Sequence, residues 1–288
     1  MVSNRKADPS VLQYLHYGGT LSRMPPKQLI EALELLISAP TPMTELASDL
    51  LGTRLQNDSA AILSDPSFLR SAVSVLDAAA SADDQGDYWW GEALQHVADC
   101  APGLAAQIAL TTILGEGWHK KERATAVLAR IASRAPDIAI DAFGPSILDK
   151  NSGWKWQVGE FREIFESLPV EAVSRWLDQV GVVGARRIAR HLPRLAVVDG
   201  QPIVPALTEM VLRRFGDDPK VLREFTAGVH HLEMTWGNLS SVYEGYRKVA
   251  EQFLNHPVAA IREWAAEEVS SSRRMETQAE KDEEDRGW

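Results

Sequence analysis

Three stretches of the chain share one pattern: HVADCAPGLAAQ (96–107), RIASRAPDIAID (130–141) and EIFESLPVEAVS (163–174). In each, an amphipathic segment ends at a proline, and a second segment rich in apolar residues follows. Proline is tolerated in the first turn of a helix and stops the helix before it, because it has no N–H to donate. The pattern therefore predicts two consecutive helices joined at each proline.

These prolines belong to a series with a nearly constant interval. The intervals are 36, 34, 33 and 33 residues between Pro66, Pro102, Pro136, Pro169 and Pro202. A helix–proline–helix unit of this period is typical of helical repeat proteins, in which neighbouring helix pairs stack. The stretch RIARHLPRLAV (187–197) has the same context around Pro193 at a shorter interval, so the repeat register between residues 170 and 220 stays open.

Apolar residues recur with the helical period through most of the chain. Examples are the sets Leu29, Leu33, Leu36 and Ala124, Val127, Leu128, Ile131. Each set forms a stripe along one side of a helix with 3.6 residues per turn. The exception is 195–204, where Asp199-Gly200 favours a tight turn, so we expect a long loop or a small hairpin there.

Two later segments resemble the second helix of a HEAT repeat: DPKVLREF (218–225) and HPVAAIREWAA (256–266). Each has a short polar residue, a proline, a β-branched residue and an arginine. The resemblance implies that Val221 and Ile261 pack in the core and that Arg262 bonds to a neighbouring repeat. It also implies the fold class: an all-α, right-handed α-solenoid of about six to eight stacked antiparallel helix pairs. The expected domains are a flexible N-terminus (1–8), a HEAT-like repeat domain (9–270) and a charged C-terminal tail (271–288) that extends the last helix into solvent and frays.

Composition narrows the possible classes of protein. The 288 residues are 45% hydrophobic and 24% charged, which is ordinary for a soluble globular protein. The one cysteine, Cys100, cannot form an internal disulfide, and the start MVSNRKADPS has no apolar run of the kind a secretory signal needs. We therefore expect a cytoplasmic protein that is not in a membrane. The net charge of −10 makes nucleic acid an unlikely partner.

The charge is distributed unevenly along the chain. Residues 31–99 carry two basic and twelve acidic side chains, whereas residues 118–134 carry five basic side chains and one acidic. Such a distribution suits a protein partner with patches of both signs. The alternative is that solvated helix faces differ in charge by chance.

Tryptophan is the unusual residue type, with nine copies against seven phenylalanines. Several indoles precede the first helix of a repeat, beside glycine, in GDYWW (86–90), GEGWH (115–119) and NSGWK (151–155). Because connections between repeats stack along one edge, they would form a row of protein-binding anchors there. The alternative is that they close the helix corners as part of the core. The candidate anchors are Trp89, Trp90, Trp118, Trp154, Trp156 and Trp236.

Arginines form a second candidate site, able to bind a phosphate or an acidic peptide. Arg186 and Arg190 share one helix face, and others follow closely. The alternative is ion pairing between repeats, using the many acidic residues. The candidates are Arg186, Arg187, Arg190, Arg194, Arg213 and Arg214.

No catalytic motif, phosphate loop or metal-ligand spacing stands out, so we expect no cofactor and no metal. The sequence therefore favours a non-catalytic adaptor or scaffold that binds a partner protein of unknown identity. The ending of the chain is similar to those of bacterial conflict-system proteins with helical repeats, which implies a place in a multi-protein system. The alternative is a nucleic-acid-binding protein that resembles the HEAT-like DNA glycosylases and uses the basic cluster Arg186–Arg214.

Overall fold

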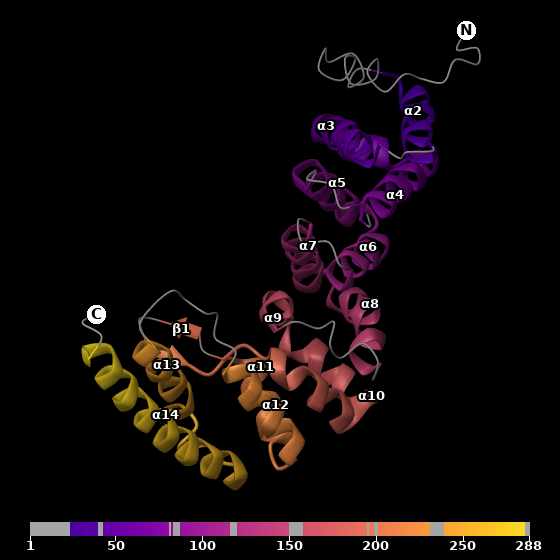
Figure 1. Cartoon of the computed structure of the whole chain (residues 1–288). Coiled ribbons are helices and arrows are strands. Elements are labelled where there is room, and N and C mark those ends of the chain that lie inside the picture. Colours follow the sequence, from indigo (N-terminus) through magenta and orange to yellow (C-terminus); the bar gives the residue numbers. More distant parts are fainter. Residues whose placement is uncertain are drawn as a thin grey trace. The chain divides into compact units, whose positions relative to one another are not determined.

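The computed structural model describes residues 24–39, 43–80, 82, 87–115, 120–149, 158–194, 196–198, 201–230 and 239–285 (Figure 1). Within them the protein is all-α apart from one small hairpin. The helices of the first half are α2 (Pro26–Ser38), α3 (Thr44–Leu63), α4 (Pro66–Ala80), α5 (Asp87–Cys100), α6 (Pro102–Leu114), α7 (Lys121–Arg134) and α8 (Pro136–Leu148). The second half contains α9 (Val158–Ser167), α10 (Val170–Ile188), the 3-10 helix η2 (Ala189–His191), β1 (Ala196–Val198), β2 (Gln201–Ile203), α11 (Ala206–Phe215), α12 (Pro219–Val229), α13 (Leu239–Glu251) and α14 (Ala259–Asp285).

The periodic prolines mark alternate helices, as the sequence predicts. Pro66, Pro102 and Pro136 are the first residues of α4, α6 and α8, and Pro169 immediately precedes α10. Each proline sits where its missing N–H would have no partner inside the helix. Pro202 is the exception, because it lies in strand β2 and starts no helix.

The chain forms two compact units, residues 1–142 and 143–288, and the expected repeat domain 9–270 spans both. In the N-terminal unit each helix from α2 to α5 packs against the next helix and against the one after that. Even-numbered and odd-numbered helices thus form two rows, which can be followed in Figure 1. The contacts are therefore mainly between helices that are neighbours in the sequence.

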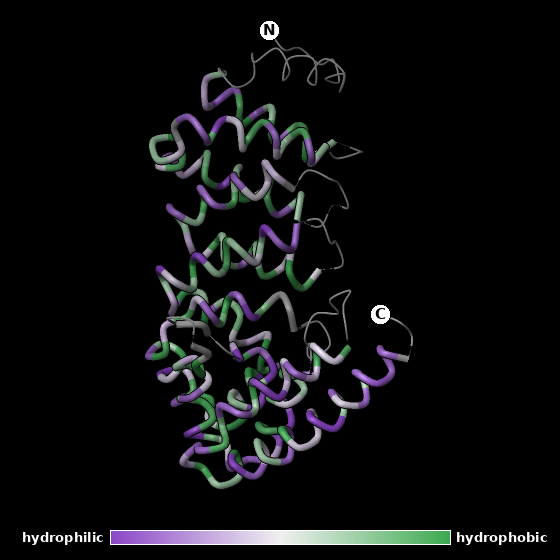
Figure 2. The backbone as a smooth tube through the Cα atoms, turned by 90° about the vertical axis from the view of Figure 1, so that its left-hand side faces the viewer, coloured by the Kyte–Doolittle hydropathy of each residue, from purple (hydrophilic) through white to green (hydrophobic). Residues whose placement is uncertain are grey.

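The core of the N-terminal unit consists of the predicted apolar stripes. Leu29, Leu33 and Leu36 of α2 are buried, and so are the four residues of the α7 stripe. Figure 2 shows apolar and polar positions alternating along the helices, as expected when each helix has one buried side.

The C-terminal unit begins with a ring cluster. Phe143 and Phe165 meet edge to face, and the ring of His191 stacks on Phe165. Trp176 of α10 is partly buried, and its ring packs against Gly184 of the same helix. Helix α10 is broken at Gly181, whose φ of +62° is a conformation that favours glycine.

The β-like stretch of the sequence is a small hairpin, one of its two expected forms. Strands β1 and β2 are antiparallel, and Val198 pairs with Gln201. This hairpin and η2 lie between α10 and α11. They interrupt the helix–proline–helix order in the stretch where the repeat register is open.

Helix α14 continues through most of the charged tail, and its C-terminal half packs against α13 (Figure 1). Ser272 and Ala279 are buried, and the backbone N–H of Ser240 in α13 donates to Glu283. The tail extends the last helix, as expected, and most of its side chains are exposed, but it does not only project into solvent, because Ala279 is buried. One side of the helix is covered by α13.

The residues singled out by the HEAT resemblance give a mixed result. Val221 and Ile261 are completely buried, as the resemblance implies. The Arg262 guanidinium donates to the carbonyl oxygens of His256 and Pro257, at 2.7 and 2.9 Å. In this chain Arg262 therefore closes the turn that precedes its own helix, and the implied bond to a neighbouring repeat is not the one that forms.

Candidate protein-binding edge

Two of the six candidate tryptophan anchors, Trp89 and Trp90, lie in the described residues, in the first turn of α5. The predictions for Trp118, Trp154, Trp156 and Trp236 concern positions outside the described residues.

Trp90 belongs to the core. Its side chain is 0% exposed, and its indole N–H donates to the carbonyl oxygen of Leu76 in α4 at 3.0 Å. The prediction of an exposed anchor is therefore wrong for this residue, and the alternative of a core indole holds. The physical reason is the helical rotation of about 100° per residue, which turns neighbouring side chains to different sides.

Tyr88 and Trp89 lie at the surface beside this buried indole. Tyr88 is 46% exposed, and its ring meets that of Trp89 edge to face, with centroids 5.0 Å apart. Trp89 is half-buried because its backbone and ring cross closely over Gly52 of α3. A Cβ at Gly52 would lie 2.7 Å from the Trp89 carbonyl oxygen, so a glycine is needed for this approach.

Arg123 of α7 completes the group. Its guanidinium carbon lies 5.6 Å from the centroid of the Tyr88 ring, within the range of a cation–π contact. Its aliphatic stem passes over Gly91, where a Cβ would stand 3.1 Å from the stem carbons. We call Tyr88, Trp89 and Arg123 the aromatic–arginine cluster. It presents two rings and one exposed cation at adjacent helices.

Lys120 shows that two connections between helices are neighbours on this edge. Its buried side chain donates to the carbonyl oxygen of Ala82 at 3.0 Å. Lys120 lies between α6 and α7, and Ala82 lies between α4 and α5. The contact between these two connections agrees with the expected stacking of connections along one edge. Lys120 itself is buried and therefore adds no charge to the surface.

The rest of the basic stretch 118–134 is partly neutralised. Asp99 of α5 accepts from Arg130 at 2.9 and 3.0 Å and from Arg134 at 2.9 Å. These exposed pairs are screened by solvent and contribute little stability. They do lower the net positive charge that the stretch presents.

The arginine candidates lie in the C-terminal unit, and four of the six are engaged in ion pairs. The pairs are Arg186–Asp218 at 2.6 Å, Arg190–Glu224 at 2.7 Å, Arg213–Glu209 at 2.9 Å and Arg214–Asp178 at 2.6 Å. Arg186 joins α10 to the N-cap of α12, Arg190 joins η2 to α12, and Arg214 joins α11 to α10, whereas the pair of Arg213 and Glu209 lies within α11. Arg187 is half-buried and Arg194 is buried. The alternative interpretation, pairing between elements, therefore describes three of these arginines, Arg186, Arg190 and Arg214.

The pair of Arg186 and Asp218 is the best-supported of the four. The Arg186 guanidinium donates twice to the carboxylate, which also accepts the backbone N–H groups of Lys220 and Val221 as the N-cap of α12. These hydrogen bonds, that of Arg186 foremost, lower the pKa of Asp218 to about 2. An anion at this place would have to displace a carboxylate that is already well bound.

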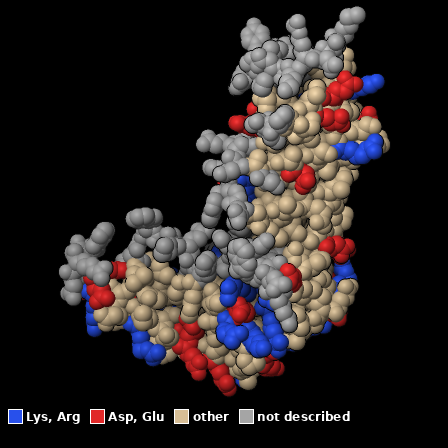
Figure 3. Space-filling model, turned by 45° about the vertical axis from the view of Figure 1, so that its right-hand side comes forward, with Lys and Arg blue, Asp and Glu red and all other residues tan. Residues whose placement is uncertain are grey.

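Figure 3 shows basic and acidic side chains next to each other on the face in view, without a large field of one sign. Among the described residues, no three His, Cys, Asp or Glu side chains gather closely enough to hold a metal ion. Within the same residues, no helix combines the length and the apolar character needed to cross a membrane.

Two members of the cluster are not among the residues that the sequence singles out. Tyr88 stands beside the indoles in the GDYWW stretch, and Arg123 is one of five basic residues in 118–134. The sequence signal for the pair is a tyrosine at the start of one expected helix and an arginine at the start of the expected helix two later.

Comparison with known protein families, curated proteins and solved structures finds no match to this chain.

Proposed function

We propose that the chain is a non-catalytic adaptor with an α-solenoid architecture that binds a partner protein through the edge carrying the aromatic–arginine cluster. The observation that carries the proposal is the contact between Arg123 and Tyr88, at 5.6 Å, on a surface where both side chains are exposed. Tyrosine, tryptophan and arginine are the residue types that contribute most to binding in protein interfaces.

The packing of the N-terminal unit supports the solenoid part of the proposal. Helices α2 to α5 each contact their next two neighbours, and a proline starts each of α4, α6 and α8. Repeated helix pairs in this order create an extended surface to which many connections contribute. The bond between Lys120 and Ala82 joins two of these connections.

The experiment compares variants of surface residues that leave the core intact. Tyr88→Ala and Arg123→Glu are tested for capture of a partner from lysate of the native host, and then with the purified partner by calorimetry. Loss of a contact at the centre of an interface weakens binding by about 1–2 kcal/mol or more, or roughly 5- to 30-fold in Kd. Leu104→Ala is the matched control, because Leu104 of α6 is 47% exposed and lies outside the cluster.

We expect a stoichiometric protein that is lost or weakened with both cluster variants and kept with Leu104→Ala. Equal binding by all of them would show that the cluster is not the binding surface.

The nucleic-acid alternative makes a different prediction. It expects DNA affinity that falls steeply with salt and depends on the arginines of the C-terminal unit. DNA binding with that salt dependence, and with no protein captured, would replace the adaptor proposal.

A further inference from the structure

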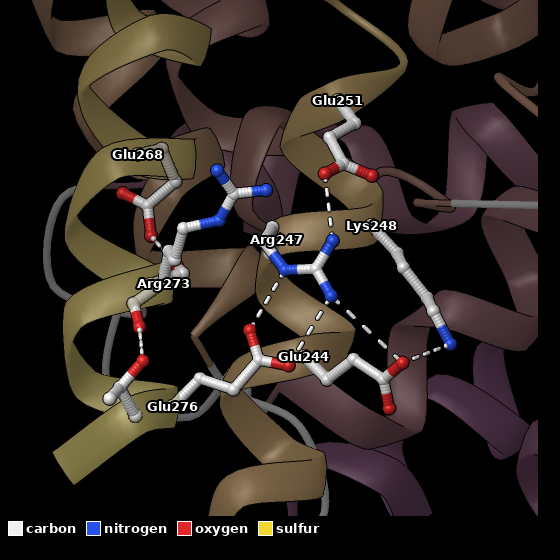
Figure 4. A network of polar contacts seen from close by, with 9 residues as sticks. Glu244, Arg247, Lys248, Glu251, Glu268, Arg273 and Glu276 are labelled. Atoms are coloured by element: carbon white, nitrogen blue, oxygen red, sulfur yellow. Dashed lines mark hydrogen bonds and ion pairs between the residues drawn. The ribbon is translucent and has the colours of Figure 1, made fainter.

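Helices α13 and α14 form an antiparallel pair, and hydrogen bonds of charged side chains join the two helices (Figure 4). Arg247 of α13 donates from Nε to Glu276 of α14 at 2.8 Å and from Nη1 to Glu251 at 2.8 Å. Further along, the backbone N–H of Ser240 donates to Glu283. These bonds hold α13 to the C-terminal half of α14, and we call the segment that contains both helices the C-terminal arm (residues 239–285).

The arm packs on α11 and α12 through a small apolar contact. The ring of Phe225 in α12 meets Phe253 and Trp264 edge to face, with centroids 5.7 and 5.4 Å apart. Ile261 fills the space over Gly216 at the end of α11, where a Cβ would lie 2.4 Å from its terminal carbon.

Two histidine–carboxylate contacts accompany this apolar patch. The first is His256, between α13 and α14, whose Nε2 lies 3.2 Å from the Glu209 carboxylate of α11. The second is His230, at the end of α12, whose Nε2 lies 2.6 Å from the Glu268 carboxylate of α14. Both contacts join the arm to the helices on which it packs.

His256 is the buried member of the two. Its side chain is 3% exposed, and its Nδ1 accepts the backbone N–H of Val258 at 3.2 Å. The charged groups that face it are Glu209 and Arg213 from α11 and Arg262 from α14. Burial is the main cause that holds the pKa of His256 below its ordinary value of 6.5, and the two arginines add to it while Glu209 opposes it.

The contact at His230 is centred on the Glu268 carboxylate. The His230 ring bonds to Glu268, which also accepts from Ser272, and Tyr246 donates to the His230 carbonyl oxygen. The bond with His230 is the first cause that lowers the pKa of Glu268, so this carboxylate stays charged in mild acid.

We propose that mild acidification releases the C-terminal arm from α11 and α12, with His256 as the titrating group. A released His256 takes up a proton near its ordinary pKa, whereas the docked side chain resists it. The released form therefore binds more protons below pH 6.5, and acid favours it by linkage. Release would expose Phe225, Ile261 and Trp264 together.

The size of the effect has an upper limit. If docked His256 stayed neutral, the ratio of released to docked protein would rise about tenfold between pH 7.5 and pH 5.5. Carboxylates with lowered pKa values titrate below this range, so they do not contribute to it.

The experiment measures thiol labelling in the full chain. Ile261→Cys places a reporter under the docked arm, and the native Cys100, which is exposed, serves as an internal reference for the intrinsic reactivity at each pH. We expect the labelling rate at position 261, divided by that at Cys100, to rise several-fold and at most about tenfold from pH 7.5 to pH 5.5. Ala185→Cys, in the core of α10, is the matched control and should show no such rise.

Two further variants identify the titrating group. His256→Asn retains an acceptor for the Val258 N–H but does not titrate, so it should abolish the pH dependence. Glu209→Gln removes the one group that favours charged His256 in the docked state, so it should make the rise larger. His230→Asn should leave the rise in place.

An unchanged ratio at the two pH values would overturn the proposal. So would a rise that persists in His256→Asn, or an equal rise at Ala185→Cys, which would indicate unfolding of the whole unit. If His256→Asn does not fold, the direction of the change in Glu209→Gln still decides, because a smaller rise contradicts the proposed role of His256.

Discussion

Replacement of Trp90 by alanine tests whether the corner of α5 is core or binding surface. The indole is 0% exposed and its N–H is bonded to Leu76. Removing a buried aromatic side chain costs about 3–5 kcal/mol, because the cavity refills only partly. Total stabilities are about 5–15 kcal/mol, so Trp90→Ala should remove about a fifth or more of the free energy of unfolding. Trp90→Phe, which keeps most of the volume but not the N–H, should cost about 1–2 kcal/mol.

Urea unfolding followed by circular dichroism measures this difference. With a slope of about 2 kcal/mol per molar urea, a loss of 4 kcal/mol lowers the midpoint by roughly 2 M. Tyr88→Ala is the matched control, two positions earlier and 46% exposed, and should change the free energy of unfolding by about 0.5 kcal/mol or less. If Trp90→Ala behaved like Tyr88→Ala, the indole would be at the surface and our assignment of it to the core would be refuted.

Three other substitutions test separate features, each by urea unfolding. Asp218→Asn keeps an N-cap acceptor but cannot ionise. Because the pKa of Asp218 is lowered to about 2, the wild type should be more stable than the variant above pH 4. It should lose that advantage as the pH falls toward 2. Gly181→Ala should lower the free energy of unfolding by about 1–3 kcal/mol through its φ of +62° alone, since no atom lies within 4 Å of the new Cβ. Its control is Gly103→Ala, near the start of α6, which should be neutral or slightly stabilising. Arg247→Met leaves the half-buried Glu276 without its cation and should lower the free energy of unfolding by about 1–3 kcal/mol. A change near zero would mean that the network of Figure 4 does not hold α13 to α14.

The all-helical fold could be predicted because its signals are local. A proline acts on the residues immediately around it, and an apolar stripe lies within one helix. The helix starts at Pro66, Pro102 and Pro136 therefore follow from the sequence. Pro202 has the same spacing but lies in a hairpin. Spacing alone therefore does not predict a helix start, because it carries no information about the flanking residues.

The candidate site could be predicted only in part. GDYWW places aromatic residues at a helix start, but which ring points inward depends on where the helix begins. Helix α5 begins at Asp87, with no proline to mark it, so the burial of Trp90 could not be deduced. The contact of Tyr88 with Arg123 joins residues that are far apart in the sequence and is set by tertiary packing.

The packing of the C-terminal arm has a signal in the sequence, a seven-residue period of small residues. Its last helix has no stripe of large apolar residues, which favoured a solvated tail. Three small residues, Ala265, Ser272 and Ala279, are nevertheless buried and recur every seven positions. A seven-residue period keeps one narrow stripe of a helix facing a neighbouring helix. Small buried residues of this kind allow close packing against a neighbouring element, and α13 packs against the part of α14 that includes Glu276.

The arrangement of the arginines bears on the choice between a protein and a nucleic acid as partner. Binding to DNA gains its free energy from cations that replace counterions along the phosphates. Arg186, Arg190 and Arg214 would have to exchange carboxylates at 2.6–2.7 Å for phosphates, and three acidic groups would then be left close to the DNA backbone. A protein surface imposes no such exchange, because it can present acidic and basic groups that match a mixed pattern. The net charge of −10 and the pairing of Arg186, Arg190 and Arg214 between elements therefore support our proposal of a protein partner over a nucleic acid.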